Sequence, residues 1–376
     1  MMKTDSYVFD LHAASTDCVA LEDSIMVKGS PVQAGSGILE GFISPVDATV
    51  VERLRENGFP LGGKTRMLEF GIPNLQEDEE AAASGALGAV EAVASGAARW
   101  ALCNDIFGVY RRLAVARSVC YIHPTYGTVS RYGLIPLACS MDQIGVVCRD
   151  PADGFKLLSF IAGKDPRDGA MLPEAAYKYE NTCKEITIGL PETVVALTGD
   201  EHRAALRAFA GRFPTVEAAL PLFPYCKQVM YILASAEISG NLSRYDGIKF
   251  GRAAPDCRDL KELYTRSRTE GFGRETKLAS VMGAMLLSQA YYSRYYEKAM
   301  QVRRLIKESL RFDKYDVLAL PCFIQGDPFN NLSLYALAPL AGLPSATFSF
   351  MGQGIQLLAK PGNEAVLRMA LEVLGR

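Results

Sequence analysis

The chain has few of the residues that usually bind metals. It contains only three histidines and one tryptophan among 376 residues, and none of its nine cysteines forms a CxxC pair. Zinc sites in proteins need closely spaced Cys and His ligands. We therefore expect no metal site, and we expect no bound cofactor.

The chain also has no marked excess of charge of either sign. It carries 40 Lys and Arg against 42 Asp and Glu, a formal net charge of −2. Without a strongly basic surface there is no electrostatic reason for broad contact with nucleic acid, so we expect none. A local group, Arg266, Arg268, Arg274 and Lys277, is interpreted as a solvated helix face.

Long apolar runs are missing as well. No window approaches the ~18–20 consecutive apolar residues that span a bilayer, so we expect no membrane segment. The first residues, 1–6, include an acid and no apolar run, unlike a signal peptide. An odd number of dispersed cysteines is typical of a reducing compartment. These features predict a cytoplasmic protein.

What the chain does have is enough apolar material for a sizeable core. Its hydrophobic fraction is 49%, which allows one large domain or two smaller ones. Helical periodicity and short apolar runs alternate, which indicates an α/β protein with a mixed sheet. We predict buried strands at 146–148, 186–188 and 317–320, and we predict helices at 47–58, 85–100, 202–212, 258–270 and, with a break, 275–311. Asp47 is the expected N-cap of the first helix and Gly58 its C-terminal stop.

Several motifs follow one another along the chain in a recognisable order. They are 47–54 (DATVVERL), 63–70 (GKTRMLEF), 123–135 (HPTYGTVSRYGLI), 140–145 (SMDQIG), 161–168 (IAGKDPRD) and 341–344 (AGLP). Together they resemble the amidase-signature family, and within it most closely the A subunits of tRNA-dependent amidotransferases. The resemblance implies an amidase-signature fold: a mixed β-sheet core covered by helices on both faces. It also implies a single domain, 1–376, which is short at its N-terminus and has a shortened loop at about 71–85.

Members of this family hydrolyse amides with a Ser–Ser–Lys triad, and this chain departs from it. The resemblance places Glu22 at the lysine, Ala89 at the bridging serine and Val109 at the nucleophile. The segment that should supply the nucleophile, 104–112 (NDIFGVYRR), contains no serine. A carboxylate does not simply replace a lysine whose role depends on a lowered pKa. We therefore expect no family-type catalytic residue in this chain.

The resemblance also places apolar residues where relatives hold their substrate. The arginine that binds the substrate carboxylate becomes Ala279, and the aspartate that binds its amine becomes Leu332. With Phe107 and Val109 these residues form a candidate apolar cleft, in which glutamine would lack both charged anchors.

Other polar groups near the triad positions are interpreted as structural rather than catalytic. Asp105 and Arg111 are interpreted as structural, because a buried charge needs a partner. Cys103 is interpreted as a core thiol, since no neighbouring His or Lys would activate it. Glu22 and Asp23 could form an acidic pair for acid–base or metal chemistry, but adjacent strand residues point to opposite sides.

From these departures we expect that the chain is not an enzyme, although its ancestry is that of an amidase. Our first hypothesis is a non-catalytic subunit or regulator, with a paralogous amidase, an amidotransferase-like subunit or a second copy as partner. A second hypothesis is a small-molecule binding module that uses the apolar cleft. A third is an amidase- or amidotransferase-type enzyme with altered chemistry at Glu22 and Asp23 or at Cys103.

Overall fold

The computed structural model describes residues 6–73, 87–173, 185–324 and 331–373. The loop predicted to be short, 71–85, lies outside these ranges from residue 74 onward.

Eleven strands of the described residues form one sheet, in the order β1-β3-β2-β4-β6-β5-β10-β11-β9-β7-β8. The strands are β1 (Tyr7–Asp10), β2 (Val19–Glu22), β3 (Leu61–Thr65), β4 (Trp100–Asn104), β5 (Cys120–His123), β6 (Ile144–Cys148), β7 (Ile188–Leu190), β8 (Thr215–Glu217), β9 (Val317–Pro321), β10 (Ser345–Phe350) and β11 (Gln353–Ala359). Strand β2 runs parallel to β3 and β4, and β7 runs parallel to β8 and β9. The centre, from β4 through β6, β5, β10 and β11 to β9, is antiparallel. The predicted mixed sheet is thus confirmed.

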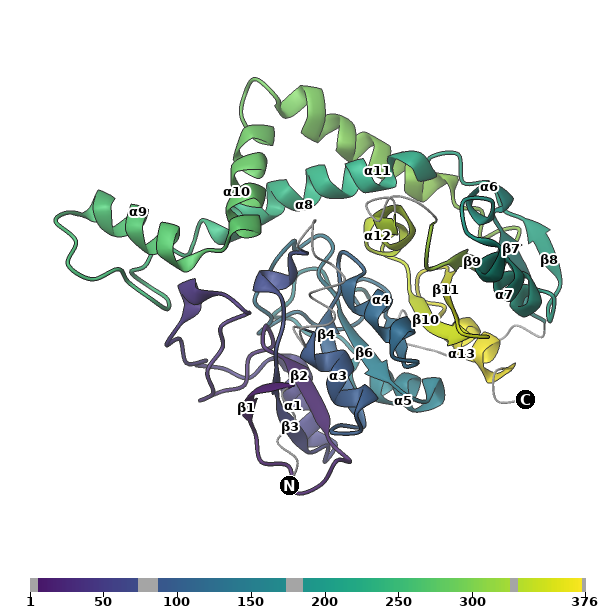
Figure 1. Cartoon of the computed structure of the whole chain (residues 1–376), viewed down its shortest axis with the longest axis horizontal. Coiled ribbons are helices and arrows are strands. Elements are labelled where there is room, and N and C mark those ends of the chain that lie inside the picture. Colours follow the sequence, from purple (N-terminus) through teal and green to yellow (C-terminus); the bar gives the residue numbers. More distant parts are fainter. Residues whose placement is uncertain (1–5, 74–86, 174–184, 325–330, 374–376) are drawn as a thin grey trace.

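Helices cover both faces of this sheet (Figure 1). The α-helices are α1 (Thr49–Glu56), α3 (Gly88–Ala94), α4 (Val109–Ala116), α5 (Pro151–Ile161), α6 (Glu192–Val195), α7 (Asp200–Ala210), α8 (Cys226–Leu242), α9 (Leu260–Gly271), α10 (Arg274–Leu286), α11 (Glu297–Ser309), α12 (Asn331–Ala341) and α13 (Glu364–Glu372). A π-helical turn, η5 (Tyr292–Tyr296), precedes α11, and short 3-10 turns lie at Gly37–Leu39, Glu69–Gly71 and Phe223–Tyr225.

Successive strand residues pack into two separate cores, as the alternation of side chains along a strand requires. In β4, Ala101 and Cys103 belong to a core with residues of α3, α4, α8 and α12. Trp100 and Leu102 belong to a second core with residues of α1, α5, α7 and α13. Burial of both faces explains why the central strands consist almost wholly of apolar residues.

Most of the predicted elements are present. The strand predicted at 186–188 lies further along the chain, as β7 (Ile188–Leu190), and two helices differ at their boundaries. Helix α1 begins after Ala48, and its predicted cap, Asp47, instead accepts from the Lys28 backbone N–H at 2.8 Å and pairs with Arg55. Gly58 does follow the helix with a positive φ of 74°. The helix predicted at 85–100 covers only Gly88–Ala94, because the chain turns at Gly96, where φ is 79°, and enters β4.

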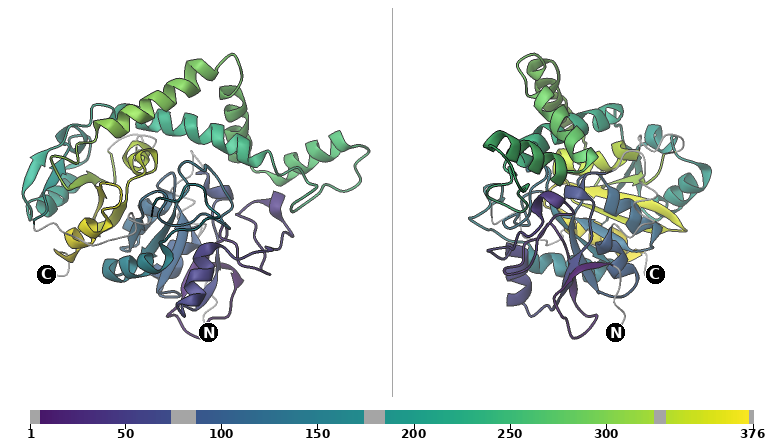
Figure 2. Two further views of the ribbon diagram at one scale, coloured as in Figure 1. Left: turned by 180° about the vertical axis from the view of Figure 1, so that it is seen from behind. Right: turned by 60° about the vertical axis from the view of Figure 1, so that its left-hand side comes forward.

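The segment 260–309 holds three helices that lie outside the sheet. Figures 1 and 2 show α9 and α10 extending away from the strands, with α10 packed on α8. Helix α11 instead packs on α8 and α12, and its Arg303 donates to the backbone carbonyl of Leu340. The break predicted within 275–311 falls between α10 and α11, and it includes the π-helical turn. Within the described residues no helix is long and apolar enough to cross a membrane.

Candidate functional site

Glu22, the last residue of β2, is the centre of a buried polar group. Its side chain is fully buried. Its Oε2 accepts hydrogen bonds from the Ser24 hydroxyl at 2.5 Å and from the Asn104 backbone N–H at 3.1 Å. Burial raises the pKa of this carboxyl to about 7, against the opposing effect of these hydrogen bonds. Glu22 is therefore poised to gain or lose a proton near neutral pH.

One oxygen of this carboxyl has no partner among the described residues. Glu22 Oε1 is buried and makes no hydrogen bond, and the same holds for the hydroxyl of Tyr110 on α4. The Tyr110 hydroxyl nevertheless lies close enough to lower the pKa of Glu22. Buried polar atoms without partners are rare in folded proteins. The Tyr110 hydroxyl is therefore the polar group that faces this side of the Glu22 carboxyl.

Asp23 lies beside Glu22 in sequence but has different partners. Its carboxyl is 3.6 Å from the Nζ of Lys64, and it accepts from the Gln33 backbone N–H at 3.0 Å. Lys64 Nζ also donates to the backbone carbonyls of Asp23 and Ile25. The two acids therefore act separately, as expected for neighbours along a strand.

Lys64 is fully buried in β3, and the sequence analysis missed it. Burial lowers its pKa to about 8, against the opposing effect of Asp23. The feature of the sequence that could have revealed Lys64 is a lone lysine within the buried segment 61–65 (LGGKT). Its ammonium is already committed to Asp23 and two carbonyls, so we assign it to positioning β2 rather than to proton transfer.

The other two positions aligned with the triad lie on helices that adjoin this group. Ala89 is in the first turn of α3 and Val109 is the first residue of α4. Both are buried in the same apolar core, together with Cys103 and Tyr110. Helix α3 contacts both β2 and α4. The structure thus brings Glu22, Ala89 and Val109 to adjoining elements around β4.

The residues of the candidate apolar cleft also belong to this core. Phe107, Val109 and Leu332 are buried in it, and Ala279 of α10 packs against it. The ring of Phe107 stacks on Tyr231, with 6.3 Å between the ring centres. These residues therefore share one apolar core with Tyr110, whose hydroxyl lies beside Glu22.

Cys103 and Arg111 have the structural roles expected from the sequence. Cys103 is fully buried, and burial raises the pKa of its thiol well above the usual range, which opposes thiolate formation. Arg111 is also fully buried, and its Nε lies 3.0 Å from Asp105 Oδ2. Its Nη1 donates to the backbone carbonyl of Tyr335 and to the side chain of Gln356, and its Nη2 donates to the backbone carbonyls of Asp105 and Ile106.

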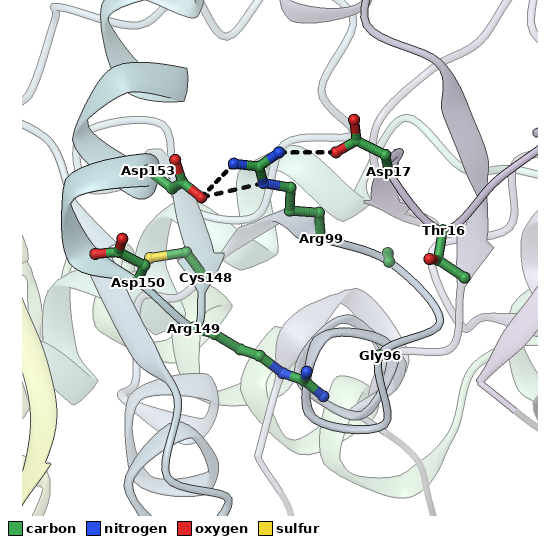
Figure 3. Close-up of a pocket in the computed structure, with 9 residues that line it drawn as sticks. Thr16, Asp17, Gly96, Arg99, Cys148, Arg149, Asp150 and Asp153 are labelled. Atoms are coloured by element: carbon green, nitrogen blue, oxygen red, sulfur yellow. Dashed lines mark hydrogen bonds and ion pairs between the residues drawn. The ribbon is translucent and has the colours of Figure 1, made fainter.

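A surface pocket of about 350 Å³ lies at the opposite end of β4 (Figure 3). Arg99 bridges Asp17 and Asp153 across it, at 3.0 and 2.6 Å. The buried acid Glu22 adjoins Asn104, where β4 ends. Because it lies at the other end of β4, the pocket does not bear on the chemistry at Glu22.

Comparison with known proteins shows to which family the chain belongs. The model of the amidase family matches residues 18–74 and 82–337. The chain belongs to the amidase family. It is 37% identical to the A subunit of the glutamyl-tRNA(Gln) amidotransferase of Solidesulfovibrio magneticus, over 95% of this chain and 82% of that one. It is 36% identical to the protein of the same name from Desulforudis audaxviator, over 93% of this chain and 79% of that one.

Solved structures of amidase-family proteins share the fold. The A subunit of the glutamyl-tRNA(Gln) amidotransferase of Thermotoga maritima superimposes with a TM-score of 0.73, is 25% identical, and covers 98% of this chain and 86% of its own. The peptide amidase of Stenotrophomonas maltophilia superimposes with a TM-score of 0.71 at 23% identity, over 94% of this chain and 81% of its own. The predicted amidase-signature fold is therefore confirmed.

The prediction that this chain is not an enzyme is wrong. Relatives 34–37% identical over nearly its whole length are amidotransferase subunits, which points to an amidase- or amidotransferase-type enzyme. The prediction gave more weight to the replaced triad and substrate positions than to the hypothesis of altered chemistry, which these relatives leave open.

Proposed function

We propose that this protein is an amidase-type hydrolase with altered chemistry, in which Glu22 is the general base. The observation that carries the proposal is the buried Glu22 carboxyl, whose pKa is about 7 and whose Oε1 makes no hydrogen bond to the described residues, with the Tyr110 hydroxyl as its nearest polar neighbour. A general base is most effective when its pKa lies near the working pH.

The proposed reaction uses water in place of a serine nucleophile. The free Glu22 oxygen removes a proton from a water molecule as the water oxygen attacks the amide carbonyl carbon. The C–N bond then breaks, and the departing nitrogen takes the proton from the Glu22 carboxylic acid. Water and amide thus become carboxylate and ammonium, and Glu22 returns to its starting state. Tyr110, whose hydroxyl is buried beside Glu22, is positioned to donate a hydrogen bond to the carbonyl oxygen as it gains negative charge.

This proposal includes replacement of the family triad at Glu22, Ala89 and Val109. With alanine and valine at the two serine positions, no covalent acyl-enzyme would form. The apolar side chains of Phe107, Val109 and Leu332 favour amides without a charge near the reacting carbonyl.

The test is an assay of hydrolysis in which ammonia release is measured. The substrates are a panel of uncharged primary amides, and glutamine is included for comparison. We expect turnover of at least one uncharged amide, with kcat/KM rising with pH through about 7. The Glu22→Gln variant should lose about 10²- to 10⁴-fold in kcat. A fluorophosphonate, which labels activated serines, should leave the protein unlabelled. Equal activity of Glu22→Gln and wild type, or stoichiometric fluorophosphonate labelling, would refute the mechanism.

We also infer that the protein acts together with a second protein. The support is that relatives at 36–37% identity are named as subunits of an amidotransferase. A paralogous amidase, another amidotransferase-like subunit or a second copy of this chain would each satisfy this inference. Sedimentation velocity of the protein, alone and with candidate partners, tests it.

A further inference from the structure

Tyr121 is a fully buried residue of β5 whose side chain reaches past the neighbouring strand. In the sheet, β6 lies between β5 and β4. The Tyr121 hydroxyl nevertheless donates a hydrogen bond to the backbone carbonyl of Cys103 in β4, at 3.3 Å. Burial raises the pKa of this phenol well above its usual range. Tyr121 therefore keeps its proton and remains a donor, and the reaction proposed for Glu22 does not yet use it.

A glycine in β6 leaves the space that the Tyr121 side chain occupies. Gly145 lies opposite Cys103 where β4 pairs with β6. A Cβ atom at Gly145 would lie 2.4 Å from the Tyr121 hydroxyl oxygen, so a larger residue there would displace the hydroxyl. The ring of Tyr121 also stacks on that of His123, with 6.4 Å between the ring centres. The Tyr121 hydroxyl is therefore fixed in position beside the Cys103 carbonyl.

The carbonyl that accepts from Tyr121 belongs to the same peptide group that binds Glu22. The Cys103 carbonyl and the Asn104 N–H are the two ends of one planar peptide. The N–H end donates to Glu22 Oε2 at 3.1 Å, while the carbonyl end accepts from Tyr121. Hydrogen bonds in a chain polarise one another, so a donor at the carbonyl makes the N–H a stronger donor. Tyr121 is thereby linked to the Glu22 carboxylate through a single peptide group.

The other groups that act on Glu22 come from several elements. Burial has the largest effect on the pKa of its carboxyl and raises it. Hydrogen bonds from Ser24 and Tyr110 lower this pKa, and the charge of Asp105 raises it. Lys64 of β3 and the Cys103 thiol of β4 also interact electrostatically with Glu22. Removal of the Tyr121 hydroxyl takes away none of these groups, so it isolates the contribution of the bridging peptide.

We propose that Tyr121 is a positioning residue for the Glu22 carboxyl and acts through the Cys103–Asn104 peptide. Its hydroxyl fixes the peptide and strengthens the N–H bond to Oε2. This bond holds the carboxyl in one orientation and favours its ionised form, the form in which Glu22 accepts a proton from water. The inference rests on the proposed function, in which Glu22 is the general base, and it adds a residue that acts on that base without contact with the substrate.

Infrared difference spectroscopy of the full-length protein measures the titration of Glu22 without any substrate. The C=O stretch of a protonated carboxyl disappears on ionisation, and the band that Glu22→Gln removes is that of Glu22. We expect Tyr121→Phe, which keeps the stacked ring, to raise the midpoint of this titration by about 0.3–0.6 pH unit, because a less polarised N–H stabilises the carboxylate less. The pH profile of kcat/KM for amide hydrolysis should shift in the same direction by the same amount.

The matched control is Tyr335→Phe, because Tyr335 is also buried and its hydroxyl donates to a backbone carbonyl, that of Cys322, at 2.8 Å. This variant should move the Glu22 midpoint by less than about 0.1 pH unit, since that carbonyl is not on the peptide that binds Glu22. Cys103→Ala removes the thiol beside the Tyr121 hydroxyl but keeps the carbonyl, so it should also leave the midpoint in place.

An unchanged midpoint in Tyr121→Phe would overturn the proposal. An equal rise in Tyr335→Phe would also overturn it, because the loss of any buried hydroxyl would then have the same effect. An equal rise in Cys103→Ala would assign the effect to the thiol instead of the peptide. Failure of the proposed function gives a different result, since Glu22→Gln would then hydrolyse amides as well as wild type, whatever the infrared midpoint of Tyr121→Phe.

Discussion

Replacing Glu22 by glutamine should stabilise the folded protein, and the gain should grow with pH. The carboxyl is fully buried and its pKa rises from 4.5 to about 7 on folding. The folded state therefore holds the Glu22 proton more tightly than the unfolded state does. This contribution to stability is complete below pH 4.5 and is lost as the pH rises through 7. Glutamine cannot ionise, so the variant avoids that loss.

The magnitude follows from the two pKa values. With 1.36 kcal/mol for each pH unit between them, the variant should gain about 0.8 kcal/mol relative to wild type at pH 5 and about 3 kcal/mol at pH 8. These figures are the pH-dependent part only. The altered hydrogen bonds to Ser24 and Asn104 add a contribution that is the same at both pH values.

Urea unfolding of wild type and Glu22→Gln at pH 5 and pH 8 measures this difference. The matched control is Glu56→Gln, because Glu56 is an exposed glutamate at the end of α1. Its effect should change by less than about 0.5 kcal/mol between the two pH values. If the stability difference between Glu22→Gln and wild type is the same at pH 5 and pH 8, Glu22 does not titrate as inferred.

Three further results are expected. Lys64→Met should destabilise the fold by about 3–5 kcal/mol, because it leaves the Asp23 carboxyl buried without its cation; in urea unfolding the Asp23→Asn/Lys64→Met double variant should recover part of that loss, and full additivity of the single effects would count against the ion pair. Gly108→Ala should cost clearly more than Gly58→Ala, since both have positive φ but only at Gly108 would the Cβ meet Tyr335, 2.2 Å from its Cγ; equal midpoints in thermal unfolding would contradict this. Cys103→Ala should keep amide hydrolysis within about twofold of wild type, because burial opposes thiolate formation at Cys103; loss of activity in a folded variant would assign the thiol a role in the reaction.

Sequence reasoning was most accurate where a local pattern determines the structure. The apolar runs at 146–148 and 317–320 lie in buried strands because both faces of the sheet are covered. Arg111 and Asp105 pair because a buried charge needs a partner wherever it lies. Asp47 was assigned wrongly as a cap, since its carboxyl has a competing partner in Arg55, eight residues along the chain.

The chemistry of the site depends on contacts that no local pattern shows. Glu22 gains its raised pKa from full burial, and its neighbour Tyr110 comes from a segment almost ninety residues away. Lys64 contacts Asp23 only because β3 pairs with β2. Alignment of motifs identified which residue occupies each position, but it could not show the environment that decides what a carboxyl there can do.

The order of strands in the sheet has a consequence for synthesis on the ribosome. Strand β5 is complete by residue 123, yet its second neighbour, β10, begins only at Ser345. Until then one edge of β5 has no strand beside it, and exposed edges of this kind favour pairing with other chains. At synthesis rates of about 5–20 residues per second, the edge stays open for roughly 10–45 seconds. The middle of the sheet is therefore the last part to close, and it is where a nascent chain most needs protection.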